Sequence, residues 1–327
     1  MVILSHNTAL RYWLSPSAEA AVPAGSLRGA NASPLPLAYA RTLEACGFGS
    51  PAHILLPRSA PGAHKRSFAQ HEIPSALLGR RIYRVGPDLL VCDPATAYVQ
   101  ACSTMKPAEG VFWGNALCSR YVICDAEAAG FRPRQPITRR EELLSLATGC
   151  SVPGAQRARQ ALSSVRDGAA SPMENALAVK LALPLSRGGA GFPDLRLNHR
   201  LDIPGRLQRT AGRSHYKCDV FLPEHDIAIE YDSDAFHTGT DRIASDARRR
   251  NTLEAMGITV VTVTRQQLID PFEFFGVVQR LYAIVGRRLQ VRYDPIERQI
   301  ALSRSFAALL KESKTMPQRL GAPLFYT

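Results

Sequence analysis

The feature that most constrains the fold is the stretch 218–237, which reads CDVFLPEHDIAIEYDSDAFH. Two apolar runs alternate with a period of two residues and are joined by a polar turn at 223–226, which is the pattern of a β-hairpin. Acidic side chains interrupt both runs. Strict alternation divides the first strand into two faces, one formed by Cys218, Val220 and Leu222 and the other by Lys217, Asp219 and Phe221.

The register of this hairpin brings two carboxylates together. With the short turn, Leu222 is expected to pair with Ile227. The same register places Asp219 directly across from Glu230, and like charges on opposed Cβ atoms about 4.5–5.5 Å apart are destabilising. The pair is tolerated if one acid is protonated, if an Arg or Lys side chain lies between the two, or if a divalent cation binds both. A solvated outer face of the hairpin is the remaining alternative.

The hairpin lies within a regular succession of helices and strands. Period and capping signals predict helices over 171–183, 241–256 and 272–286, and strands over 195–203, 217–223, 227–232 and 258–264. The first helix begins at the N-cap Ser171, and the second ends at Gly257. The order α-β-β-β-α-β predicts an α/β domain over 161–300, in which helices flank a mixed central sheet.

This arrangement resembles the PD-(D/E)XK, or restriction-endonuclease-like, superfamily. The pattern is most similar to the compact branch related to very-short-patch repair endonucleases, and to the nuclease-like C-terminal half of abortive-infection antitoxin-type proteins. The resemblance covers about 165–285. The residues that carry it are, in chain order, Ser171, Glu174, Asp219, Glu230, Asp232, His237, Asp246, Arg249, Leu253 and Gly257.

The resemblance implies metal-assisted hydrolysis of phosphodiester bonds with Mg²⁺ or Mn²⁺. Asp219 and Glu230 would hold the metal, with Glu174 as an additional ligand from the first helix. Glu174 also occupies the position of a capping-box glutamate after Ser171, which is the structural alternative for that side chain. The metal lowers the pKa of a bound water and polarises the phosphate.

Two departures from the superfamily pattern bear on the catalytic assignment. Asp232 stands where the superfamily usually has a lysine that assists the nucleophile. His237 follows shortly after and is assigned the role of general base or phosphate contact. Lys217, which the register places opposite Asp232, is an alternative source of the missing ammonium group.

Nucleic-acid contacts are expected close to the hairpin. Arg213 and His215 precede the first strand and, with Lys217 and Arg249, are assigned to phosphate binding. Two functions remain open at this point, and a third, an enzyme unrelated to nucleic acid that uses a carboxylate-bound metal, requires that the C-terminal core is assigned wrongly. The first is a metal-dependent endonuclease acting on double-stranded DNA in defence, repair or mobile elements. The second is a non-catalytic DNA-binding antitoxin or transcriptional regulator with a nuclease-like fold.

The first 160 residues are expected to form a separate, basic, mixed α/β domain that binds DNA or a protein partner, such as a toxin or defence component. Basic residues alternate with aromatic ones in the segments 64–71 and 79–85, which suits contact with phosphates. The Ser-, Gly- and Arg-rich stretch 151–170 is interpreted as the domain boundary, and 301–327 as a C-terminal tail.

Composition narrows the class of protein. The net charge of +12 favours a polyanionic partner. The seven cysteines never occur as CxxC, which argues against a structural zinc site and a disulfide framework. No apolar run is long enough to cross a bilayer, and the opening residues are too few and too polar for a secretory signal. We therefore expect a cytoplasmic protein without membrane contact.

Overall fold

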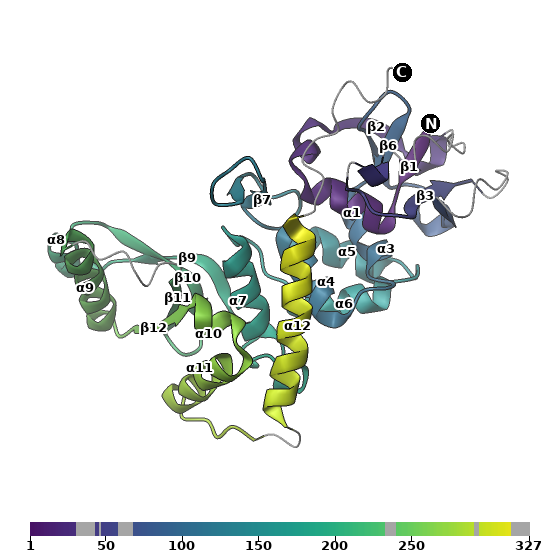
Figure 1. Ribbon diagram of the computed structural model, residues 1–327. Coiled ribbons are helices and arrows are strands. Elements are labelled where there is room, and N and C mark those ends of the chain that lie inside the picture. The colour runs from purple at the N-terminus through teal and green to yellow at the C-terminus, as the bar shows by residue number, and fades with distance from the viewer. Residues whose placement is uncertain (31–42, 46, 58–67, 233–239, 291–293, 315–327) are drawn as a thin grey trace. The chain divides into compact units, whose positions relative to one another are not determined.

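The chain divides into two compact units, one comprising 1–165 with 309–327 and the other 166–308. A computed structural model of the protein describes residues 1–30, 43–45, 47–57, 68–232, 240–290 and 294–314 (Figure 1). Both units combine helices with mixed β-sheets, so the chain belongs to the α/β class. No helix among these described residues is both long and apolar enough to cross a membrane.

Unit 1, the unit that contains 1–165, is built on a sheet of mixed direction with the strand order β2-β5-β6-β1-β3-β4. The central strand β1 runs parallel to β6 and antiparallel to β3, and β3 runs parallel to β4. The strands are β1 (Val2–Leu4), β2 (Val22–Ser26), β3 (Ala52–Leu56), β4 (Phe68–Glu72), β5 (Arg81–Arg84) and β6 (Leu89–Cys92). A separate pair joins β7 (Tyr121–Ile123) to β8 (Phe131–Pro133).

Helices of unit 1 pack closely because small residues face one another. The helices are α1 (His6–Leu14), α3 (Pro94–Ala101), α4 (Pro107–Leu117), α5 (Arg140–Gly149) and α6 (Ala155–Leu162). The hydroxyl of the fully buried Tyr98 donates a hydrogen bond to the carbonyl oxygen of Gly110 at 2.9 Å. A Cβ atom at Gly114 would lie 2.6 Å from Val165 and 3.0 Å from the Tyr98 hydroxyl. Glycine is therefore required at this point of α4.

Unit 2, which comprises 166–308, contains a four-stranded sheet in the order β12-β11-β10-β9. β9, β10 and β11 pair antiparallel, whereas β11 and β12 pair parallel. The strands are β9 (Arg196–Asp202), β10 (His215–Leu222), β11 (Ile227–Asp232) and β12 (Thr259–Thr264). The helices are α7 (Pro172–Ala182), α8 (Gly205–Ala211), α9 (Thr240–Ala255), α10 (Arg265–Ile269) and α11 (Pro271–Ile284). Figure 1 shows α7 and α9 on opposite sides of this sheet.

Several local predictions for unit 2 are confirmed. Leu222 pairs with Ile227 as predicted, but the pairing of β10 with β11 ends at Val220 and Ile229, so the described strands do not extend it to the expected pair of Asp219 and Glu230. The Ser171 hydroxyl accepts a hydrogen bond from the main-chain N–H of Glu174 and caps α7, as predicted for a serine directly before Pro172. Gly257 follows α9 with a φ of +80°, the left-handed conformation that commonly ends a helix.

Strict alternation along the first hairpin strand is wrong. Cys218 and Phe221 lie in one hydrophobic cluster with Leu253 of α9, although alternation predicts opposite faces. The ring of His199, the register partner of Cys218, also stacks on Phe221. The irregularity lies at Asp219 and at Asn198, which has a φ of +48°. Period-two reasoning failed because it assumes uninterrupted pairing on both sides of the strand.

Two segments interpreted as connections contain helices. The stretch 151–170 includes α6, whose Ala155, Ala158 and Ala161 are buried and form a narrow stripe. The expected tail over 301–327 is occupied through residue 314 by α12 (Pro295–Lys314). The buried positions of α6 are mostly alanines, which contribute little to an apolar periodicity. The serine, glycine and arginine residues around them therefore dominated the sequence pattern.

A candidate carboxylate site in unit 2

Asp219 occupies a break in the pairing of β10. Within the described strands, β10 pairs with β9 on both sides of Asp219 but not at that residue, and its pairing with β11 ends at Val220. The carboxylate of Asp219 accepts a hydrogen bond of 2.8 Å from the main-chain N–H of Tyr231. A side-chain oxygen thus satisfies a donor that a regular ladder would pair with a carbonyl. The carboxylate is held in place at the end of the hairpin ladder.

Glu174 connects α7 to the strand that neighbours Asp219. Its Oε2 accepts hydrogen bonds from the main-chain N–H of Ala170 at 2.9 Å and from the Asn198 side-chain amide at 2.7 Å. The same amide donates to the carbonyl oxygen of Gly168 at 3.0 Å. Glu174 therefore supports the start of α7 through Ala170, not through the Ser171 N–H that a capping box would use, and is also oriented toward the irregular position in β9.

Burial makes ionisation of the hairpin carboxylates costly. Desolvation, followed by the negative charge of Glu174, raises the pKa of Asp219 to about 6, against the opposing effects of the Tyr231 N–H, Arg249 and Lys217. Desolvation also raises the pKa of Glu230 to about 7, and the charge of Asp219 contributes in the same direction. Glu174 thus acts electrostatically on Asp219, and Asp219 acts on Glu230.

Arg249 of α9 supplies a positive charge to Glu230. Its guanidinium forms a short, charge-assisted hydrogen bond with Glu230 Oε1 and donates a second one, of 2.7 Å, to the carbonyl oxygen of Lys217. The guanidinium also lies over the ring of Tyr216, 5.6 Å from its centroid. The sequence left three ways to tolerate the acidic pair: protonation, a basic side chain or a divalent cation. At Glu230 the structure shows the basic side chain, Arg249.

The other predicted residues lie at the edges of this site. Lys217 and His215 are exposed on β10, and the guanidinium of Arg213 lies 5.1 Å from the ring centroid of Tyr216. Asp232 is the last residue of β11 and pairs with β12. The described pairing of β10 with β11 ends at Val220 and Ile229, so it does not reach the expected pair of Lys217 and Asp232. His237 lies outside the described residues.

A run of exposed cations extends from β9 to the start of β10. We call 196–217 the basic segment: it contains a single acidic residue, Asp202, whose exposed carboxylate pairs with Arg200 at 2.7 Å. Sequence reasoning selected only the end of this segment and missed the rest, although the density of arginine was visible. Its exposed basic residues are Arg196, Arg200, Arg206, Arg209, Arg213 and Lys217.

The carboxylates fit a divalent cation in chemistry but do not form a closed three-ligand site. Mg²⁺ is commonly bound through one or two carboxylates, with water and phosphate completing the coordination. In the described part of the chain, three side chains of metal-binding type have ligand atoms within 4.8 Å of one another at a different place, in unit 1. The oxygens of Glu174, Asp219 and Glu230 do not meet this distance as a group of three. Glu174, the expected additional ligand, is thus not brought together with both Asp219 and Glu230 at this distance. A site built on Asp219 and one further carboxylate is compatible with the geometry.

Comparison with known protein families, with curated proteins and with solved structures finds no match for this chain.

Proposed function

We propose that unit 2 is a metal-dependent endonuclease that hydrolyses phosphodiester bonds in DNA. The observation that carries the proposal is Asp219, a half-buried carboxylate whose pKa is raised by desolvation and by the charge of Glu174, next to the basic segment 196–217. The observed succession α7, β9, β10, β11, α9, β12 supports the likeness to a restriction-endonuclease-like core, with α8 as an addition between the first two strands.

Asp219 and one of its two carboxylate neighbours hold Mg²⁺ or Mn²⁺ in this proposal. When bound, the ion activates water and polarises the scissile phosphate. The Tyr231 N–H fixes the direction of the Asp219 carboxylate, and Asn198 fixes that of Glu174. Side chains that are oriented in advance need no reorganisation when the substrate arrives.

In this proposal Glu230 has two alternative partners, the guanidinium of Arg249 and the metal ion. Without a cation, the guanidinium neutralises Glu230. If Glu230 were to hold a divalent ion, Arg249 would lose this partner, and its guanidinium would be available to a phosphate close to the basic segment. Arg249 would therefore contact nucleic acid only when the metal is bound, and Glu230 would be a metal ligand only after Arg249 has released it.

The basic segment binds the DNA backbone. Arg206 and Arg209 on α8 and Lys217 on β10 are exposed, and such side chains bind phosphates independently of sequence. Asp232 and His237 complete the catalytic set carried over from the superfamily. The protein acts in the cytoplasm in a defence, repair or mobile-element context, and a toxin or another defence component would be its protein partner.

The test is cleavage of supercoiled plasmid with Mg²⁺ or Mn²⁺. Asp219→Asn is expected to abolish nicking while DNA binding persists. Glu174→Gln and Glu230→Gln are both expected to slow it, and the larger loss identifies the carboxylate that shares the cation. Glu254→Gln on α9, which replaces an exposed carboxylate, serves as the matched control and retains wild-type nicking. Wild-type protein that binds DNA but does not cut it with any divalent metal would contradict the proposal.

A second function is favoured by one observation. The bonds from Arg249 to Glu230 and to the Lys217 carbonyl can be a permanent structural link between α9 and β10. Unit 2 would then be a non-catalytic, DNA-binding antitoxin or transcriptional regulator. In that case Asp219→Asn and Glu230→Gln leave the only measurable activity, DNA binding, unchanged, and added Mg²⁺ does not alter the thermal stability of the protein.

A further inference from the structure

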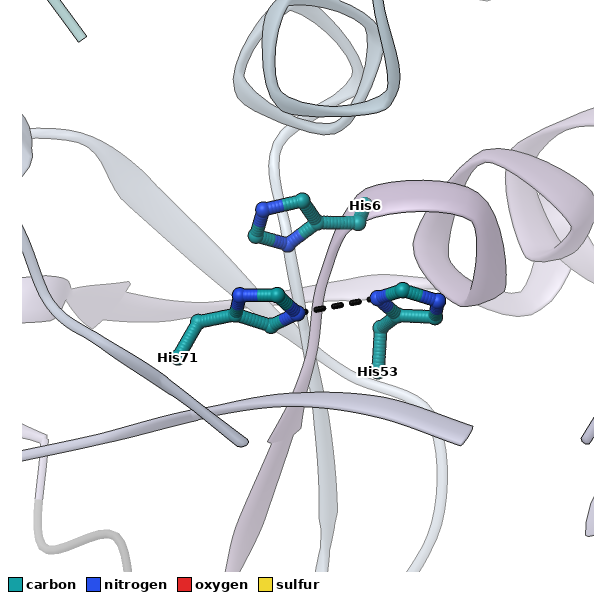
Figure 2. Close-up of side chains that lie close together, drawn as sticks. All are labelled: His6, His53 and His71. Carbon is teal, nitrogen blue, oxygen red and sulfur yellow. Dashed lines mark hydrogen bonds between the residues drawn. The ribbon is translucent and has the colours of Figure 1, made fainter. Parts of the chain in front are cut away.

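Three histidines that are far apart in the sequence meet in unit 1. His6 is the first residue of α1, His53 lies in β3 and His71 lies in β4. Figure 2 shows the three rings side by side, with a ring nitrogen of His53 directed at one of His71. Within the described parts of the chain, these three histidines form the group of potential metal ligands whose ligand atoms all lie close to one another.

The ring nitrogens are spaced nearly as a metal would require. His53 Nδ1 and His71 Nε2 are 2.9 Å apart, and one ring nitrogen from each of the three histidines lies within 4.8 Å of the others. Bonds of about 2.0–2.1 Å in a tetrahedral zinc site separate the ligand nitrogens by about 3.3 Å. Because the His6 ring is stacked on that of His71, coordination of one ion by all three requires the His6 side chain to rotate until its ring nitrogen points at the position shared by the other two.

The backbone holds the cluster together from three directions. The main-chain N–H of Ser5 donates to the carbonyl oxygen of His53 at 3.0 Å, and the His53 N–H donates to the Thr8 hydroxyl at 2.8 Å. His6 adopts a φ of +47°, which is uncommon for a residue other than glycine, and its Nδ1 lies 3.0 Å from the Ser5 hydroxyl. The turn from β1 into α1 thus directs the His6 ring onto the two strand histidines.

The environment keeps these imidazoles neutral, which is the form that binds metals. Burial and the neighbouring histidines lower the pKa of His6 to about 3, and burial and His53 lower the pKa of His71 to about 4. The ring centroids of His6 and His71 are 3.7 Å apart and nearly parallel. All three side chains are only partly buried, so an ion can reach them from solvent.

We propose that His6, His53 and His71 form a binding site for a divalent transition-metal ion of the zinc class. Three imidazoles supply the protein ligands, and water takes the fourth position of a tetrahedron. The absence of a carboxylate from this trio disfavours Mg²⁺ and Ca²⁺, which prefer oxygen ligands. The bound ion joins the β1–α1 junction to β3 and β4. This site is independent of the carboxylates of unit 2.

The alternative is a stacked group of neutral imidazoles joined by an N–H···N hydrogen bond. Metal binding is tested on tag-free, full-length protein that has been treated with EDTA and then titrated with Zn²⁺ against a chromophoric chelator at pH 7.5. One equivalent is expected to bind. Co²⁺ in place of Zn²⁺ is expected to give the intense visible absorption of a tetrahedral complex, and this measurement needs no substitution.

Variants assign the ligands. His53→Gln and His71→Gln each remove one imidazole and are expected to weaken Zn²⁺ binding by more than about 100-fold, since even loss of an indirect, orienting partner costs about 10–100-fold. His199→Gln replaces a partly buried histidine of unit 2 and is expected to leave the affinity unchanged. Asp219→Asn should also retain the bound equivalent.

Two results would overturn the proposal. One is folded wild-type protein that takes up no Zn²⁺ and gives no tetrahedral Co²⁺ spectrum. The other is one equivalent of Zn²⁺ that binds with the same affinity to wild type, His53→Gln and His71→Gln, which would place the ion elsewhere. Neither result depends on nuclease activity.

Discussion

Replacement of Asp219 by asparagine is expected to change how the stability of unit 2 depends on pH. The pKa of Asp219 is about 6 in the folded chain, whereas an unperturbed aspartate has a pKa of about 4. Because the folded state binds the proton more tightly than the unfolded state, Asp219 stabilises the fold fully below about pH 4. This contribution is lost as the pH rises through about 6.

The size of the effect follows from the two pKa values. A tenfold change in proton affinity is worth about 1.4 kcal/mol, so a pKa of about 6 instead of about 4 corresponds to about 3 kcal/mol. Asparagine is neutral throughout this range, and its side-chain oxygen can still accept the hydrogen bond from the Tyr231 N–H. At pH 4 the unfolded aspartate is already about half ionised, so the unfolding free energy of Asp219→Asn, relative to wild type, should increase by about 2 kcal/mol between pH 4 and pH 7.5.

Hydrogen exchange of peptides from β10 and β11 is the appropriate assay. Both tryptophans, Trp13 and Trp113, belong to unit 1, so tryptophan fluorescence would report on the wrong unit. Exchange gives the free energy of opening for the hairpin itself. Glu254→Gln, an exposed carboxylate on α9, should show the pH dependence of the wild type. A difference between Asp219→Asn and wild type that is the same at pH 4 and pH 7.5 would refute the assignment of a costly, ionised Asp219.

Three further predictions concern other parts of the chain. Arg249→Met removes the guanidinium that pairs with Glu230. We expect the free energy of opening, measured in the same exchange assay, to fall by about 2 kcal/mol, and the apparent affinity for Mn²⁺ to rise. An unchanged free energy would show that the ion pair is dispensable. Gly114→Ala places a methyl group 2.6 Å from Val165 and should destabilise unit 1 by about 1–3 kcal/mol in urea unfolding followed by tryptophan fluorescence, whereas wild-type stability would mean that α4 can move without cost. Arg209→Ser should weaken DNA binding equally for unrelated sequences and reduce the slope of log affinity against log salt by about 1, and a sequence-selective loss would argue against a backbone contact.

Local chemistry in the sequence determined a large part of unit 2. The short turn after Leu222 and the alternation of β11 set the hairpin register, because these signals act between residues that are close along the chain. The Ser171 cap and the glycine after α9 are likewise short-range signals. A hairpin with carboxylates at its open end was therefore predictable from the sequence.

The tertiary structure alone decided what surrounds those carboxylates. Arg249 lies on a helix after the hairpin, and which carboxylate it meets depends on how α9 packs on the sheet. Pairing with β9, where Asn198 has a positive φ, breaks the alternation at Asp219, and a period-two pattern contains no information about a neighbouring strand. The meeting of His6, His53 and His71 follows from the strand order β1-β3-β4 of a sheet assembled from separated segments. Sequence patterns describe interactions along one strand or helix, whereas contacts between distant segments depend on the packing of the whole core.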